Sequence, residues 1–230
     1  MKAADVMVTN VITVGPDTRV EEIARILLAN RISAVPVVDD GKLIGIVSEG
    51  DLMRRPEAGT ERARSWWLAA LTNTRTLADE FVRTHSRRAG DVMTRMVVTA
   101  KPDTSLADVA SLLERNRIKR VPIVEDGRVV GIVSRANLLQ ALASRAADAD
   151  LTPAVGDATL RGRVMAQLTA APRVQPALFN VIIRDGAVDL WGSVDSEAER
   201  KAIRVAAELT PGVRSVNDHL VVQPTMVSGC

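Results

Sequence analysis

An internal repeat constrains the fold of this chain more than any other feature of its sequence. The segment 5–52, DVMVTNVITVGPDTRVEEIARILLANRISAVPVVDDGKLIGIVSEGDL, aligns without a gap on the segment 91–138, DVMTRMVVTAKPDTSLADVASLLERNRIKRVPIVEDGRVVGIVSRANL. Met7 and Met93 are 86 positions apart, and every later matched pair keeps that offset. We therefore expect two copies of one structural unit, each covering apolar surface of the other.

The spacing within each copy predicts a helix, a β-hairpin and a second helix. In the first copy, Thr18 and Glu21 have the spacing of a capping box, and apolar residues then recur with helical period. Asn30 follows at a position that favours a left-handed residue. Two strand-like runs, 32–38 and 43–47, flank an Asp-Gly turn, and the proline in the first run favours an edge or a bulge.

The motifs DVM, PDT, VPVVD and GIVS, the last followed in the first copy by an aspartate, resemble those of the CBS domain. Their recurrence resembles a tandem CBS pair over roughly residues 4–142. The resemblance implies an α+β fold, with two β-α-β-β-α repeats packed as a pseudo-twofold pair and an adenosine-ligand cleft between them. It favours AMP, ADP or ATP over NAD or S-adenosylmethionine. The ligand-binding residues implied are Thr13, Ala34, Val35, Pro36, Ser48 and Asp51, then Thr99, Lys119, Arg120, Val121, Pro122, Ser134 and Asn137.

Ser48 and Asp51 give the first copy a chemistry suited to a nucleotide. Ser48 is expected at a helix N-cap, where free amides and the helix dipole favour a phosphate. An ionised Asp51 is only an acceptor, so its one carboxylate accepts from both vicinal ribose hydroxyls. The structural alternative is that the two side chains merely form a reciprocal cap.

The second copy departs from this pattern in two places. Asn137 replaces the aspartate, and losing a charge-assisted hydrogen bond, worth about 1.5–3 kcal/mol, predicts a weak or empty second cleft. Lys119 and Arg120 stand where the first copy has small residues. We therefore hypothesise one composite site, in which Asp51 holds the ribose, Ser48 the proximal phosphate, and the two basic residues further phosphate charge. The alternative for Arg120 is an ordinary solvated side chain.

An insert between the repeats is expected to form a helical hairpin. Trp66 and Trp67 would project about 100° apart on a helix, so one of them is expected to pack within the chain or to contact another domain or subunit. The resemblance to CBS pairs also implies a homodimer. The predicted boundaries are 1–55 for repeat one, 56–88 for the insert, 89–145 for repeat two, 146–156 for a linker, 157–223 for a further domain and 224–230 for a tail.

The segment 157–223 predicts a domain with the element order α-β-β-α-β. Its motifs RDGAVDLWGSVDS and TPGVRSVND resemble the BON domain, which implies phospholipid or membrane-surface attachment. Its basic and acidic side chains balance in number, so we expect no polybasic patch. We therefore predict an interaction or output role with a protein partner, and the alternative is a phospholipid-associated adaptor.

Composition and motifs exclude several other classes. The 30 basic and 28 acidic side chains are too evenly balanced for specific nucleic-acid binding. The single cysteine, Cys230, allows neither an internal disulfide nor a thiolate metal cluster. No phosphate-loop, dinucleotide or metal-ligand motif is present in the sequence. We expect a soluble, cytoplasmic, nucleotide-sensing regulatory module without catalysis or bound metal; a structural dimer with vestigial clefts is the remaining alternative.

Overall fold

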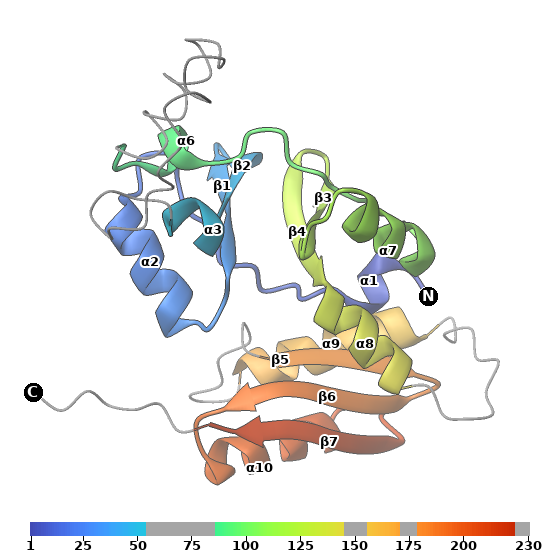
Figure 1. The fold of residues 1–230 in the computed structure, drawn as a ribbon. Coiled ribbons are helices and arrows are strands. Elements are labelled where there is room, and N and C mark those ends of the chain that lie inside the picture. The colour runs from blue at the N-terminus through green and yellow to red at the C-terminus, as the bar shows by residue number, and fades with distance from the viewer. Residues whose placement is uncertain (54–85, 145–155, 171–178, 224–230) are drawn as a thin grey trace, which may run out of the picture. The chain divides into compact units, whose positions relative to one another are not determined.

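The computed structural model of the protein describes residues 1–53, 86–144, 156–170 and 179–223 (Figure 1). The predicted helical insert, apart from residues 86–88, lies outside the described residues, and so do Trp66 and Trp67. The predicted linker as far as residue 155 and the tail also lie outside them.

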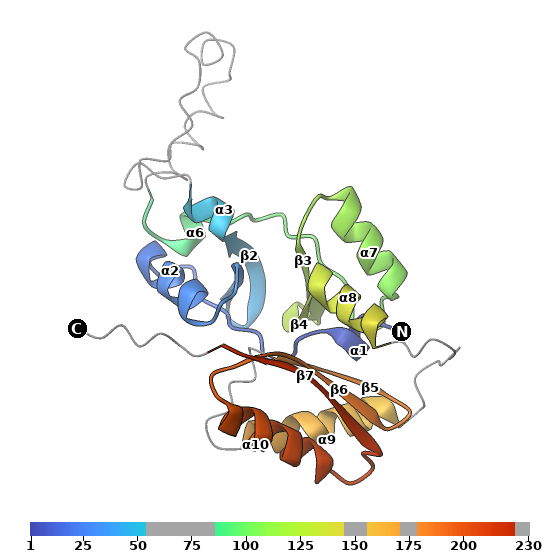
Figure 2. The ribbon, with the colours of Figure 1, turned by 60° about the horizontal axis from the view of Figure 1, so that its bottom comes forward.

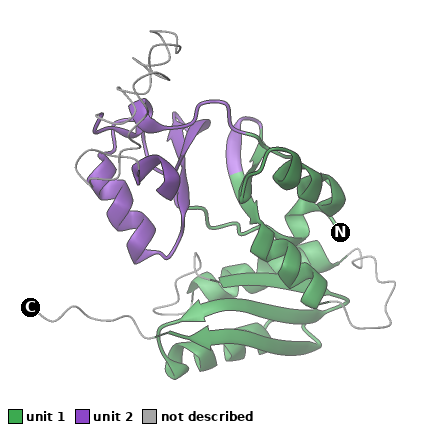
Figure 3. Ribbon diagram, viewed as in Figure 1, with its two compact units in different colours: residues 1–11, 98–125, 130–230 green, residues 12–97, 126–129 purple. Residues whose placement is uncertain are grey.

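The chain divides into two compact units (Figure 3). Unit 1 contains residues 1–11, 98–125 and 130–230, and unit 2 contains residues 12–97 and 126–129. This division differs from the linear repeats, because the first eleven residues belong with the second repeat and residues 86–97 with the first. Each unit therefore joins stretches of chain that are far apart in the sequence.

Unit 2 contains α2 (Val20–Ala29), β1 (Ala34–Asp39), β2 (Lys42–Ser48), α3 (Glu49–Leu52) and α6 (Ala89–Val92). β1 and β2 pair antiparallel, and the register shifts between Val37 and Val38, close to Pro36, where the sequence favours an edge or a bulge. Val14 forms an isolated parallel bridge with Val37. In the described residues, this bridge stands where the β-α-β-β-α resemblance implies the first strand of the repeat. The apolar side chains of α2, both strands and α6 form one core.

α2 begins one residue later than the sequence predicts. Its N-cap is Arg19 rather than Thr18, and no side chain caps it. The Val20 N–H instead donates to the carbonyl of Arg87 at 2.9 Å, and Arg19 pairs with Arg88 in an isolated antiparallel bridge. A backbone segment from elsewhere in the unit thus meets the need that a capping box was expected to meet.

The residue with left-handed backbone after α2 is Arg31, with a φ of 50°, rather than the predicted Asn30. Asn30 has a φ of −99°, and its side-chain amide donates to the carbonyl of Ile26 at 2.9 Å, which satisfies one of the last carbonyls of the helix. The predicted Asp-Gly turn is confirmed. Asp40 and Gly41 have φ angles of 46° and 77°, as a type I′ hairpin turn requires.

The second repeat, with the N-terminal residues that belong to it, forms α1 (Ala3–Val6), α7 (Leu106–Arg115), β3 (Arg120–Glu125), β4 (Arg128–Ser134) and α8 (Arg135–Ala143). The backbone joins α1 to this repeat, because the Ala3 N–H donates to the carbonyl of Thr104 at 2.8 Å. Ala100 pairs with Ile123 in a parallel bridge that matches the bridge in unit 2. The two repeats therefore share the same local construction.

The C-terminal part of unit 1 forms α9 (Asp157–Ala170), β5 (Phe179–Arg184), β6 (Ala187–Val194), α10 (Glu197–Glu208) and β7 (Ser215–Val222). The predicted order α-β-β-α-β is confirmed. The strands lie in the order β5-β6-β7, with β5 and β6 antiparallel and β6 and β7 parallel. α9 and α10 cover one face of this sheet, as Figure 2 shows, and share an apolar core with it.

Candidate functional site

Ser48 and Asp51 meet where β2 ends and α3 begins. The backbone N–H of Ser48 donates to Oδ2 of Asp51 at 2.9 Å, and the Ser48 hydroxyl donates to the same oxygen at 2.7 Å. Both side chains are partly buried, and Ala34 lies opposite Ser48 in the hairpin. The contact is the reciprocal cap that the sequence offers as the structural alternative, and a role for either residue in ligand binding stays a prediction.

Thr13 lies beside the other residues predicted to contact the ligand in repeat one. The next residue, Val14, donates its N–H to the carbonyl of Pro36 at 3.1 Å and accepts from the Val38 N–H at 2.9 Å. Thr13 itself is exposed, whereas Pro36 is buried. Val35 exposes none of its surface and packs in the core of unit 2.

Repeat two places its predicted residues in the same way. The N–H and hydroxyl of Ser134 donate to Oδ1 of Asn137 at 2.8 Å and 2.7 Å. Thr99 is exposed, and the N–H of the following residue donates to the carbonyl of Pro122 at 3.1 Å. Val121, like its counterpart in repeat one, exposes none of its surface and belongs to the core.

Asn137 differs from Asp51 in its surroundings. Asn137 exposes only 4% of its surface, whereas Asp51 is of intermediate exposure. Its side-chain N–H₂ donates to Oε1 of Gln140 at 3.1 Å, and the same Oε1 accepts from Nδ2 of Asn180 in β5 at 3.1 Å. The sequence did not predict Gln140 or Asn180 as part of this site. The replacement of the aspartate by an amide at position 137 was the only local signal of this arrangement.

Lys119 and Arg120 lie at the start of β3. Lys119 is exposed, and its carbonyl accepts from the N–H of Arg135, the first residue of α8, at 3.2 Å. Arg120 is partly buried. Because Asp51 belongs to unit 2 and Arg120 to unit 1, their use in one composite site stays a prediction.

The class of this protein follows from its two hairpins. Each hairpin ends in a serine, and a helix follows that serine at once. Models of the CBS domain match residues 3–58 and 89–144, and a model of the BON domain matches residues 156–224. The chain belongs to the CBS-domain family, as a tandem CBS pair followed by a BON domain.

Similar proteins match over rather more than half of this chain. An uncharacterized protein of Methanocaldococcus jannaschii is 36% identical over 143 residues, which cover 57% of this chain and 85% of that protein. The chloroplastic CBS domain-containing protein CBSX1 of Arabidopsis thaliana is 33% identical over 56% of this chain and 57% of its own length. Inosine-5′-monophosphate dehydrogenase of M. jannaschii is 30% identical over 60% of this chain, and the match spans 23% of that enzyme.

The crystal structure of CBSX2 in complex with AMP has the same fold over the CBS pair. Its TM-score is 0.54 at 29% sequence identity, and the match covers 63% of this chain and 99% of that chain. Among the residues that the structure describes, no group of three or more His, Cys, Asp or Glu side chains is arranged to hold a metal ion. None of the described helices is both long and apolar enough to cross a membrane.

Proposed function

We propose that this chain is a non-catalytic regulatory module whose CBS pair binds an adenosine nucleotide, with AMP, ADP or ATP as the ligand. The observation that carries this proposal is the contact between Ser48 and Asp51. It fixes a carboxylate beside the serine that precedes α3 as its N-cap, so that acceptors for a ribose and donors for a phosphate lie next to each other, as the two groups do in a nucleotide.

The structural cap and the ligand contact are compatible in this proposal. Asp51 uses Oδ2 for both hydrogen bonds from Ser48, and these hold the carboxylate in one orientation. A carboxylate offers about four acceptor positions on its two oxygens, so a carboxylate held in this way still accepts from two vicinal hydroxyls. The cap therefore preorganises the ribose contact, which lowers the entropy lost on binding.

The AMP complex of CBSX2 supports an adenosine ligand for a CBS pair of this fold. In our proposal Thr13, Ala34 and Pro36 border the base, because the hydrogen bond from Val14 to Pro36 holds Thr13 next to β1. Lys119 and Arg120 supply positive charge for further phosphates, which favours ADP and ATP as additional ligands.

Calorimetric titration of the full chain with AMP tests the proposal, with Asp51→Asn as the variant. Asn137 makes the same two contacts with its serine, so the amide should keep the cap and the fold. We expect AMP affinity to fall about tenfold or more, because a charge-assisted hydrogen bond is lost. Asp39→Asn is the control, since Asp39 is exposed at the opposite end of the same hairpin. Unchanged AMP affinity in Asp51→Asn would refute the ribose contact.

The BON domain acts in this proposal as an interaction or output unit rather than as a lipid anchor. Arg161 and Arg184 are each only 8% exposed. Arg200 contacts Asp218 at 2.8 Å, and Arg214 contacts Asp185 at 2.8 Å. These four basic side chains are therefore buried or ion-paired, which lowers the positive charge that the BON domain presents to anionic lipids. Flotation with vesicles of anionic phospholipid tests this, and salt-sensitive binding of the full chain would favour the adaptor function.

The proposal includes a cytoplasmic homodimer. Leu28 on α2 is 80% exposed, and Leu139 and Leu142 on α8 are 66% and 61% exposed, so both repeats present apolar side chains on helices. Sedimentation of the full chain over a range of concentrations tests the dimer, and a monomer at every concentration would exclude it.

A further inference from the structure

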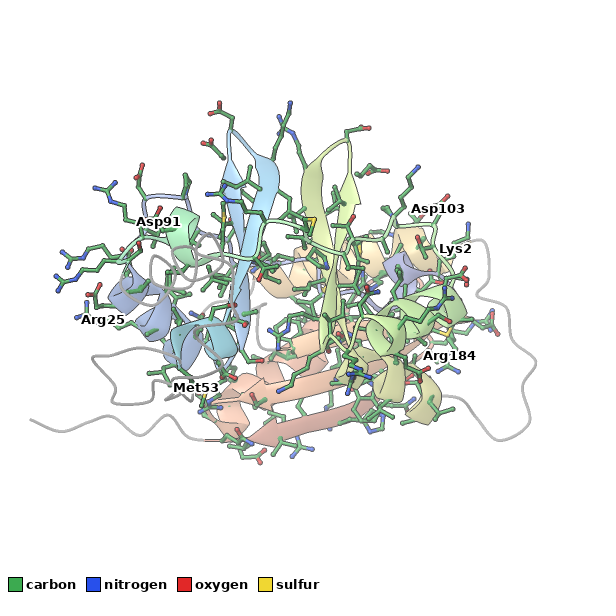
Figure 4. All side chains as sticks on the ribbon, turned by 45° about the horizontal axis from the view of Figure 1, so that its top comes forward. Lys2, Arg25, Met53, Asp91, Asp103 and Arg184 are labelled. Carbon is green, nitrogen blue, oxygen red and sulfur yellow. The ribbon has the colours of Figure 1, made fainter. Side chains whose placement is uncertain are left out.

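Within unit 1, the BON domain is docked on the second CBS repeat. The sheet face that α9 and α10 leave uncovered lies against α1 and α8 in both views (Figures 1 and 2). Ile182 of β5 exposes no surface and joins the core of repeat two, and Trp191 packs against the same core. The Trp191 indole N–H donates to the hydroxyl of Ser144 at 3.0 Å, and Arg184 (Figure 4) donates to the carbonyl of Ala141 at 3.0 Å.

Asn180 lies at the centre of this docking contact. Its Nδ2 donates to Oε1 of Gln140 at 3.1 Å and to the carbonyl of Val6 at 2.9 Å. Arg161 lies beside it and donates to the carbonyls of Val181 and Met7. A single asparagine of the BON domain thus contacts α1 through a buried hydrogen bond and α8 through a partly buried one.

Gln140 connects Asn180 to Asn137, and this connection requires an amide at position 137. The Oε1 of Gln140 accepts from Nδ2 of both asparagines, while Oδ1 of Asn137 accepts from Ser134. An aspartate at 137 would be acceptor-only and would face the Gln140 oxygen without a proton between them. Turning the Gln140 amide round would then set its NH₂ against the Asn180 donor, whose orientation the Val6 carbonyl fixes.

The difference between Asp51 and Asn137 therefore has a structural cause. We propose that Asn137 holds the BON domain on the second repeat through Gln140, because its NH₂ orients the Gln140 amide so that Oε1 faces the donor of Asn180. The proposal concerns docking alone, since the hydrogen bond to Gln140 uses the amide nitrogen of Asn137 and leaves its Oδ1 on Ser134.

Two variants of the full chain test the inference, Asn180→Ala in the BON domain and Gln140→Ala in α8. Hydrogen exchange reports the docking through the amides of residues 179–184. We expect protection in β5 to fall about tenfold or more. Asn137→Asp should lower it in the same way, since an aspartate cannot donate to Gln140.

Asn217→Ala is the matched control, because Asn217 lies in β7 of the same sheet and donates to Asp189 within the BON domain. Unchanged protection in Asn180→Ala and Gln140→Ala would overturn the docking contact, and unchanged protection in Asn137→Asp would overturn the role of Asn137.

Discussion

The thioether of Met7 fills the place that a β-carbon on Gly131 would need, with the Met7 Cγ 2.7 Å from that position. Unit 2 repeats this relationship, because the Cγ of Met93 would lie 2.7 Å from a β-carbon on Gly45. The methionine of each DVM motif therefore packs on the glycine that belongs, in the linear alignment, to the other repeat. The DVM and GIVS motifs recur together because the methionine of one packs on the glycine of the other.

We expect Gly131→Ala to lower the free energy of unfolding by about 1–3 kcal/mol, because the added methyl overpacks the contact with Met7. Denaturant unfolding of the full chain measures the change. Gly162→Ala is the control, since nothing lies within 4 Å of a β-carbon at that position of α9. There the alanine should be neutral or stabilise by about 0.5–1 kcal/mol. Equal effects of the two substitutions would contradict the packing explanation.

Arg161 should be difficult to replace, even by lysine. It is 8% exposed, and its Nε donates to the Val181 carbonyl at 2.8 Å while Nη2 donates to the Met7 carbonyl. Burial lowers the pKa of the guanidinium to about 10, against a smaller raising effect of Asp5, so Arg161 stays charged at neutral pH. The folded-state pKa lies below the unfolded value, so the unfavourable contribution of this group disappears only as pH rises above about 10.

We expect Arg161→Lys to lower the free energy of unfolding, because a lysine lacks the planar fork that serves both carbonyls. Each carbonyl left without a donor costs about 1–3 kcal/mol. Hydrogen exchange in α1 and β5, together with thermal unfolding, measures the loss. Arg204→Lys is the control, since Arg204 is an exposed helix residue paired with Glu208, where we expect a change below about 0.5 kcal/mol. A wild-type exchange pattern in Arg161→Lys would count against its role in docking.

The sequence predicts those features whose causes are local. The Asp-Gly turn at 40–41 is found as expected, and the Asp-Gly pair at 185–186 has the same backbone conformation, because it depends on the two turn residues themselves. The order of elements in both repeats and in the BON domain follows from periodicity and turn chemistry in the same way. The start of α2 is one exception, because backbone around Arg87, far along the chain, replaces the expected side-chain cap. The left-handed residue after α2 is another, because it is Arg31 and not Asn30.

The docking of the BON domain could not be predicted from the sequence. Asn180 and Val6, which form one of its hydrogen bonds, are 174 positions apart, and no local pattern links residues at such a distance. The asparagine at 137 was interpreted as a weakened ligand contact, since its partner Gln140 has no special motif around it. A side chain that gains a buried partner from another domain has no signature in its own repeat.

Asp157 should stabilise the BON domain by binding the turn between β5 and β6. Its Oδ2 accepts from the N–H of Asp185 at 2.8 Å, and its Oδ1 accepts from the N–H of Gly186 at 3.2 Å. Asp157→Ala leaves both amides without this acceptor, so we expect unfolding free energy to fall by about 1–3 kcal/mol. Asp157→Asn keeps one acceptor oxygen, so its free energy of unfolding should lie between those of Asp157→Ala and the wild type. Denaturant unfolding distinguishes them, and equal stability of the alanine variant and wild type would exclude this role.

Arg120 and Lys119 should matter more for ATP than for AMP. If they supply charge for the outer phosphates, Arg120→Gln removes a charge-assisted contact that AMP lacks. We expect ATP affinity to fall about tenfold and AMP affinity to change less than about threefold, as measured by calorimetry on the full chain. Arg115→Gln, which removes the same charge from the exposed last turn of α7, is the control. An equal loss of AMP and ATP affinity in Arg120→Gln would show a general electrostatic effect. Unchanged affinity for both nucleotides would show that Arg120 does not contact the ligand.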